Sequence, residues 1–158
     1  MPVLLDVSST YTDIMTSVFS TTIAAKAWFA TAAVALALVQ VLSAARIYGK
    51  LKGIVRIPYP PIGVIHRWSG RFAFVFTLPV AFHCIAILGF QTTDARVIAH
   101  SIAGSFVYGV FGAKIFILKD RGYPRWLLPV AGGTLFSVLT ALWLTSSLWY
   151  FTQVRFGF

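Results

Sequence analysis

Four long apolar runs, separated by short polar connections, constrain this chain more than any other feature of its sequence. A transmembrane helix needs about 20 predominantly apolar residues, because lipid offers no hydrogen-bond partner to an exposed backbone. The runs predict membrane spans over residues 22–48, 69–90, 94–118 and 126–151, after an N-terminal lead-in over residues 1–21. We therefore expect an all-α fold, an integral membrane four-helix bundle that forms a single domain over residues 22–158.

The composition agrees with a chain that is mostly embedded in lipid. Hydrophobic residues make up 58% of the sequence and charged residues only 11%, whereas about a quarter of the residues in a soluble domain are charged. The net charge of +9 is gathered mainly in two clusters between apolar runs. That distribution is typical of membrane topology, and we expect no nucleic-acid partner.

Basic residues mark one side of the predicted bundle. They occur in the connection between the first two spans and in the connection between the last two: Arg46, Lys50, Lys52, Arg56, Arg67 and Arg71, then Lys114, Lys119, Arg121 and Arg125. The positive-inside rule predicts that both connections are cytoplasmic, which places both termini on the extracytoplasmic side.

The junctions between the runs carry local signals. Tyr59-Pro60-Pro61 cannot continue a helix and predicts an irregular link before the second span. Thr93 is a candidate N-cap for the third span, with Asp94 in its first turn.

Two of the three histidines are predicted to lie at one depth in the membrane. His83 precedes Phe90 by seven residues and His100 follows Asp94 by six, so each lies about 10 Å below the same membrane face at a helical rise of about 1.5 Å per residue. The short connection over residues 91–93 makes the two spans antiparallel neighbours. We therefore expect the two imidazoles to face each other, with the first and fourth spans as a packing shell.

Such a pair is what a six-coordinate haem b needs, since facing helices then supply one neutral imidazole to each side of the iron. Gly104, one turn beyond His100, leaves room for the macrocycle. Tyr108 on that helix and Phe76 on the helix of His83 are candidates to pack on the ring.

Haem propionates are anionic and need a basic partner near the membrane surface. Arg96 is the favoured candidate because it is nearest to His100 in sequence, with Lys26 and Arg155 as alternatives. The competing interpretation is that each histidine forms a hydrogen bond between helices, and that the glycines and aromatic residues simply pack the bundle.

His66 is predicted to lie near the opposite face, because it precedes His83 by 17 residues, or about 25 Å along a helix. It cannot share a haem with His83. Three interpretations stay open: an interfacial residue beside Arg67 and Trp68, a hydrogen-bond partner of a quinone together with Arg67, or a contact to a haem propionate or a cofactor shared with another subunit.

Three short stretches carry a resemblance to known proteins: His66-Arg67-Trp68-Ser69-Gly70-Arg71, Phe82-His83, and His100-Ser101-Ile102-Ala103-Gly104. Over about residues 60–149 the sequence resembles small bacterial membrane cytochromes b, and more closely a bacterial family of four-helix proteins that is distantly similar to the cytochrome b-561 and ferric-reductase-like group. The resemblance implies transmembrane electron transfer through non-covalent haem b. It extends that role to His83 and His100, and it implies a multi-pass protein of the bacterial cytoplasmic membrane.

The sequence departs from those larger groups, which usually carry two haems and four histidines, because it has only three. The stretch from His66 to Gly70 also resembles the HR-x-[ST]-G segment of succinate dehydrogenase membrane anchors, which lies near quinone.

The sequence therefore predicts a haem b electron-transfer subunit of a respiratory or related redox complex, with one bis-histidine haem near the extracytoplasmic face. It would be a subunit rather than a stand-alone enzyme. Expected partners are lipid, other membrane subunits, and quinol or an extracytoplasmic Rieske or c-type cytochrome protein. Two alternatives stay open, a haem-free structural or assembly subunit and a quinone-binding membrane anchor.

Overall fold

The computed structural model describes residues 2–51, 53–54, 56–120 and 122–155, with side chains from Val7 onward. Lys52 and Arg121 of the predicted basic clusters lie outside the described residues. The described residues form helices and connecting loops: α1 (Pro2–Thr16), α2 (Thr22–Ile47), α3 (Pro61–Phe82), the π-helix η1 (His83–Leu88), α4 (Ala95–Lys119), α5 (Leu127–Trp143), and the π-helices η2 (Leu144–Leu148) and η3 (Tyr150–Arg155).

Four helical stretches are long and apolar enough to cross a membrane: Thr22–Ile47, Pro61–Leu88, Ala95–Lys119 and Leu127–Val154. For the described residues, the prediction of an all-α fold with four helices long and apolar enough to span a membrane is thus confirmed. The first and third spans agree with their predicted limits to within one residue. The fourth extends beyond residue 151 because η2 and η3 continue the helical path.

The second span begins at Pro61, not at residue 69, so the predicted irregular link was too long. Proline fits the first position of a helix, because its missing N–H is not needed there and its φ angle is already helical. The correction moves His66 and Arg67 from the predicted connection into α3.

The N-cap of α4 is Asp94, and the prediction of Thr93 was wrong. The Oδ1 atom of Asp94 accepts a hydrogen bond from the backbone N–H of Val97 at 2.9 Å. This bond satisfies one of the N–H groups that lack a partner at the start of a helix.

The predicted lead-in contains the 15-residue helix α1. Tyr11 of α1 donates a hydrogen bond to the backbone oxygen of Pro79 at 3.3 Å, and its ring lies 4.9 Å from that of Phe82. The N-terminal segment therefore packs against the end of α3, where His83 lies.

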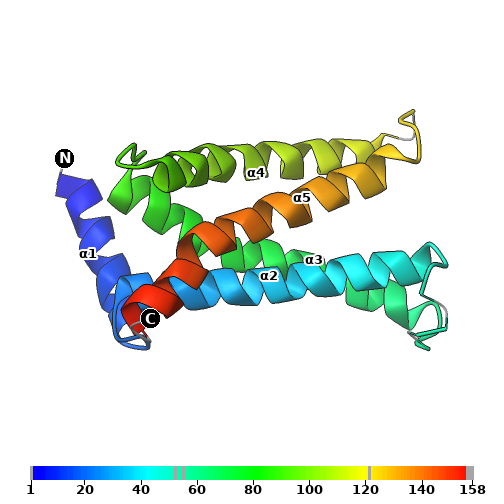
Figure 1. Cartoon of the computed structure of the whole chain (residues 1–158), viewed down its shortest axis with the longest axis horizontal. Helices are drawn as coiled ribbons and strands as arrows, with labels where there is room; N and C mark the ends of the chain where they lie inside the picture. Colours follow the sequence, from blue (N-terminus) through cyan, green and yellow to red (C-terminus); the bar gives the residue numbers. More distant parts are fainter. Residues whose placement is uncertain (1, 52, 55, 121, 156–158) are drawn as a thin grey trace.

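Helix α2 is the centre of the packing (Figure 1), which overturns the expectation that the first span belongs to an outer shell. It contacts α3, α5 and α1, and α4 packs mainly on α5. Small side chains let membrane helices approach closely, and α2 supplies most of the buried ones: Ala24, Ala25, Ala27, Ala33, Ala37 and Ser43.

Helices α3 and α4 approach each other through side chains, with few close contacts between their backbones. The rings of Phe74 and Phe111 stack at 4.3 Å, and the Tyr108 hydroxyl donates to the backbone oxygen of Thr77 at 3.1 Å. The short connection thus does not make these helices tightly packed neighbours along their length. In Figure 1 α3 runs beside α2, and the chain reaches α4 only at one end.

That end of the bundle also holds α1 and the C-terminal segment (Figure 1). We call it the terminal end and define it by α1, residues 89–94 and residues 150–155. The opposite end, which we call the basic end, is formed by residues 48–60 and 119–126. Both termini therefore lie at the same end of the bundle as the connection between α3 and α4, as the predicted topology requires.

Candidate functional site

His83 lies where α3 changes into the π-helix η1. Pro79 stands inside α3, and the backbone N–H of His83 bonds to the oxygens of Pro79 and Val80. The π-helix ends at Gly89, whose φ of 68° is in the left-handed region that favours glycine. Short π-helical segments are rare and frequently occur at functional sites.

The His83 side chain is buried without a hydrogen-bond partner. It is only 2% exposed, and neither Nδ1 nor Nε2 has a partner among the residues that the structure describes. A buried polar group left in this way costs about 1–3 kcal/mol. Tyr11 covers the site, with its ring 5.9 Å from the imidazole.

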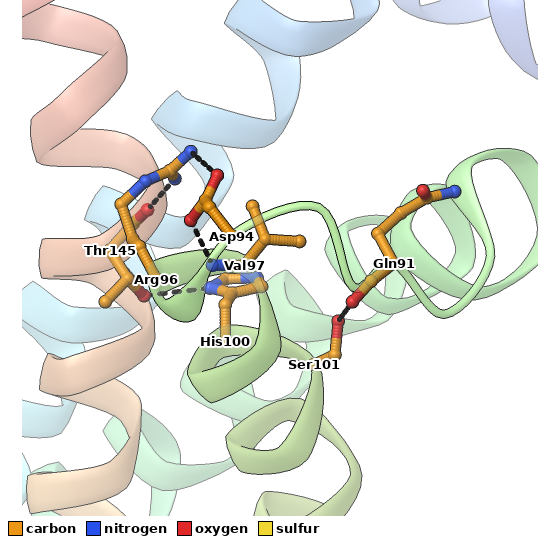
Figure 2. Close-up of polar contacts among 7 residues, drawn as sticks. All are labelled: Gln91, Asp94, Arg96, Val97, His100, Ser101 and Thr145. Carbon is orange, nitrogen blue, oxygen red and sulfur yellow. Dashed lines mark hydrogen bonds and ion pairs between the residues drawn. The ribbon is translucent and has the colours of Figure 1, made fainter.

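His100 has a defined partner on α5. Its Nδ1 atom lies 2.9 Å from the Oγ1 atom of Thr145, and Figure 2 shows the imidazole turned toward that helix. The Thr145 hydroxyl donates its own hydrogen to the backbone oxygen of Ala141 at 2.8 Å, so toward His100 it must accept. Nδ1 is then the protonated nitrogen, and in the neutral ring Nε2 carries the free lone pair.

Arg96 is fixed beside His100 by three contacts, of which Figure 2 draws those to Thr145 and Asp94. Its Nη1 atom donates to the backbone oxygen of Thr145 at 2.7 Å, its Nη2 atom lies 3.8 Å from Oδ2 of Asp94, and its guanidinium lies 4.8 Å from the centre of the Trp149 ring. Thr145 therefore holds Arg96 through its backbone and His100 through its side chain.

Lys26 of α2 and Arg96 of α4 line one cavity of about 150 Å³ at the terminal end. The same end contains the imidazoles of His83 in η1 and His100 in α4. Positively charged side chains and the two imidazoles thus belong to one end of the bundle.

The other residues predicted to surround a cofactor contact protein side chains. A Cβ atom placed on Gly104 would meet the side chain of Leu142 on α5 at 3.9 Å, so this glycine faces α5. Tyr108 is bonded to Thr77, and the Phe76 ring packs on Phe29 of α2 at 5.8 Å. Their contact with a macrocycle stays a prediction.

His66 belongs to a separate polar cluster between α2 and α3, toward the basic end. Its Nδ1 atom lies 2.9 Å from the Ser43 hydroxyl, which donates to the backbone oxygen of Val39 at 2.6 Å. Gln40 donates through Nε2 to the His66 backbone oxygen and to Ser69 Oγ at 2.9 Å. The cluster links two spans through interhelical hydrogen bonds, as polar groups in membrane helices commonly do.

The two imidazoles of the terminal end are those of His83 and His100. Among the described residues, no group of three or more His, Cys, Asp or Glu side chains is placed to hold a metal. A haem iron takes its equatorial ligands from the macrocycle, so the protein has to supply only axial ones. Imidazole nitrogens are donors of that type, and this role for His83 and His100 stays a prediction.

Reasoning from the sequence missed Thr145 and Tyr11. The signal for Thr145 was the triplet Thr145-Ser146-Ser147 inside the fourth apolar run, which places three consecutive hydroxyl groups in a predominantly apolar segment. Tyr11 carried no comparable signal, because its role depends on how α1 packs against α3.

Comparisons with known proteins place the chain in a family. No curated protein and no solved structure matches it. The sequence does match a protein family over residues 6–158, nearly its whole length. The protein therefore belongs to the family described as "Family of unknown function (DUF6529)".

Proposed function

We propose that the protein is a membrane-embedded haem b electron-transfer subunit, with His83 and His100 as the axial ligands of one haem at the terminal end. The observation that carries the proposal is the state of His83, a buried imidazole whose two ring nitrogens have no partner among the described residues. A ligand to one of these nitrogens would satisfy it.

The state of His83 is unfavourable in the protein alone. Water cannot compensate an unpaired polar group at membrane depth, and ionisable side chains inside a membrane are generally functional. Most polar groups in the spans are paired locally, as the bonds of Ser43 to Val39 and of Thr31 to Ala27 illustrate. Among the described residues, the buried side chains without a partner are those of His83, Thr140 and Ser147. His83 is the one of these three that carries ring nitrogens able to bind a metal, which favours a role as a ligand.

His100 has the complementary feature of a metal-binding imidazole. Histidines that bind metals usually donate their other N–H to a neighbouring oxygen, which fixes the ring and its tautomer. Thr145 is that neighbour, at 2.9 Å from Nδ1, and the unprotonated Nε2 would be the nitrogen that binds the iron. Thr145 is then a positioning residue for the His100 ligand.

The remaining residues of the terminal end would set the surroundings of the cofactor. Tyr11 and Phe82 form a lid of aromatic side chains on the His83 side, which limits the access of water. Arg96 and Lys26 offer positive charge to the propionates. A bound haem b supplies one-electron chemistry, while the protein controls ligation and local electrostatics.

The charge distribution supports an extracytoplasmic position for the terminal end, since Lys50, Arg56 and Arg125 lie in the connections of the basic end. The electron partner would then be quinol or an extracytoplasmic Rieske or c-type cytochrome protein, within a larger assembly of membrane subunits. We propose the bacterial cytoplasmic membrane as its location.

The haem content of the purified protein, isolated with its native partners, tests the proposal. We expect about one haem b per chain in the wild type, and loss of haem in His83→Ala and in His100→Ala. His66→Ala is the matched control, because it removes a histidine from another part of the same helix, and it should retain haem. A protein that never contains haem would favour the structural-subunit alternative. Loss of haem only in His66→Ala would show that the ligand pair is wrong.

A further inference from the structure

The cavity between α2, α4 and the C-terminal π-helices has a composition that suits an anionic group. Its volume is about 150 Å³, and its walls combine two cations and a hydroxyl with apolar and aromatic residues: Ile23, Lys26, Ala27, Leu88, Arg96, Ser146, Trp149 and Tyr150. None of the described residues that line it carries a carboxylate.

Within the described part of the chain, the positive charge at this cavity is only partly compensated. Asp94 reaches Arg96 at 3.8 Å, and its other oxygen caps the start of α4. Lys26 forms no ion pair with any acidic side chain in the described part of the chain. The whole sequence has only four acidic residues against 13 Lys and Arg.

Arg96 is held in place before any ligand arrives. Its bond to the Thr145 backbone oxygen and its contact with Trp149 fix the guanidinium at the cavity. Preorganised side chains lose less entropy on binding, and charge-assisted hydrogen bonds to an oxyanion are stronger than neutral ones.

The size and position of the cavity limit what it can hold. It is far larger than the 10–15 Å³ or so that one water requires, and smaller than the roughly 300–1,000 Å³ of a typical small-molecule pocket. It therefore accepts one charged group rather than a whole ligand. Trp149 and Tyr150 stand at the terminal end, and such rings favour the membrane interface, where lipid headgroups lie.

We infer that Lys26 and Arg96 form a binding site for a single oxyanion, a phosphate or a carboxylate, carried by an amphiphile whose apolar part lies in the membrane. The phosphate source would be an anionic lipid headgroup. The carboxylate source would be a propionate of the proposed haem. Binding of a lipid phosphate at this site does not depend on haem, so the experiment with lipids remains a test even if the proposed haem function is wrong. Only the propionate alternative rests on the proposed function.

The experiment with lipids compares the midpoint of thermal unfolding of the purified protein in two kinds of nanodisc. One contains phosphatidylcholine alone, and the other an equal mixture of phosphatidylcholine and phosphatidylglycerol. We expect phosphatidylglycerol to raise the midpoint of thermal unfolding of the wild type, because a ligand that binds only the folded state stabilises it. Lys26→Gln should lose this rise and Lys26→Arg should keep it. Lys119→Gln, which removes the same charge at the basic end, should behave like the wild type.

The carboxylate arm measures the rate at which bound haem is transferred to an excess of apomyoglobin, in phosphatidylcholine nanodiscs. If the occupant is a haem propionate, phosphatidylglycerol should not change the unfolding midpoint of the wild type. Lys26→Gln should then release haem about tenfold faster than Lys119→Gln, because it loses one charge-assisted hydrogen bond to the propionate. The inference is overturned if Lys26→Gln matches Lys119→Gln in both the lipid dependence and the haem release. If the protein holds no haem, an unfolding midpoint that does not depend on the lipid overturns the inference by itself.

Discussion

Thr145 Oγ1 lies 2.9 Å from His100 Nδ1, and the backbone oxygen of the same threonine accepts a bond from Arg96 at 2.7 Å. One residue of η2 therefore orients both the imidazole and the guanidinium that α4 brings to the terminal end. Because Thr145 also donates to Ala141, the direction of the bond with His100 is fixed, and so is the tautomer of the neutral ring.

Thr145→Val should weaken haem binding without removing a ligand. The substitution keeps the shape of the side chain and the backbone bond to Arg96 but removes the acceptor for His100 Nδ1–H. Loss of such an outer partner typically costs about 10–100-fold in affinity at a metal centre. A haem titration and a potentiometric titration measure this, with Thr145→Ser as the control that keeps the hydroxyl. Equal affinity and equal potential in both variants would show that Thr145 does not position the ligand.

His83→Leu should abolish haem binding and yet leave the haem-free protein at least as stable as the wild type. Replacing a buried imidazole that lacks partners removes a desolvation cost of about 1–3 kcal/mol. The free energy of unfolding of protein produced without haem measures the effect. His100→Leu is the matched comparison, and it should lower stability by about 0.5–1.5 kcal/mol because it breaks the bond to Thr145. A similar loss in both variants would mean that His83 has a structural hydrogen bond in the folded protein.

Gly70→Ala should destabilise the contact between α2 and α3. A Cβ atom at Gly70 would lie 3.0 Å from the Gln40 side chain, whose amide is bonded to His66 and Ser69. Moving that amide breaks hydrogen bonds worth about 1 kcal/mol each. Their loss exceeds the stabilisation of up to about 1 kcal/mol that replacing glycine by alanine brings to a helix.

Gly109→Ala is the control for this prediction, because nothing lies within 4 Å of a Cβ atom there, so only the propensity gain should remain. Adding Gln40→Ala to Gly70→Ala should recover part of the loss, and a double-mutant cycle of unfolding free energies measures that coupling. Strictly additive effects would contradict the proposed clash.

The packing of α1 on α3 should weaken at alkaline pH. Burial raises the pKa of Tyr11 above its usual 10.0, with Cys84 as a smaller contribution. The packed state of α1 therefore favours the protonated phenol. The contribution of Tyr11 to this packing is fully present below about pH 10 and is lost as the pH rises through the raised pKa of Tyr11. The ionised oxygen would also lose its bond to Pro79.

Hydrogen–deuterium exchange of the α1 amides, compared at each pH between the wild type and Tyr11→Phe, measures this change. We expect the protection of α1 in the wild type to fall toward that of the variant above about pH 10. A constant ratio of protection over the whole range would argue against a role for the phenol.

The membrane spans could be predicted from the sequence because the length and hydropathy of a run are local properties. The limits at Thr22 and Lys119 follow directly from the apolar pattern. The start at Pro61 was missed because proline was taken as a helix breaker, although the first helical position favours it.

The predicted depth of the two histidines placed both at the terminal end, but their surroundings depend on tertiary packing. The bond from His100 to Thr145 joins residues 45 positions apart, and no local pattern sets the register of α4 against α5. The change from α3 to a π-helix at His83 is likewise not visible in the apolar pattern of the second run. The short connection over residues 91–93 therefore indicates that α3 and α4 are close where they are joined. It does not indicate that they pack together along their length.

A reduced-minus-oxidised visible spectrum of the purified protein, with its native partners present, is the most direct test of the central claim that His83 and His100 hold one haem. We predict the α-band of a low-spin b-type haem in the wild type and in His66→Ala, and its absence in His83→Ala and His100→Ala. A wild-type spectrum without that band, or one that persists in both single variants, would contradict the claim.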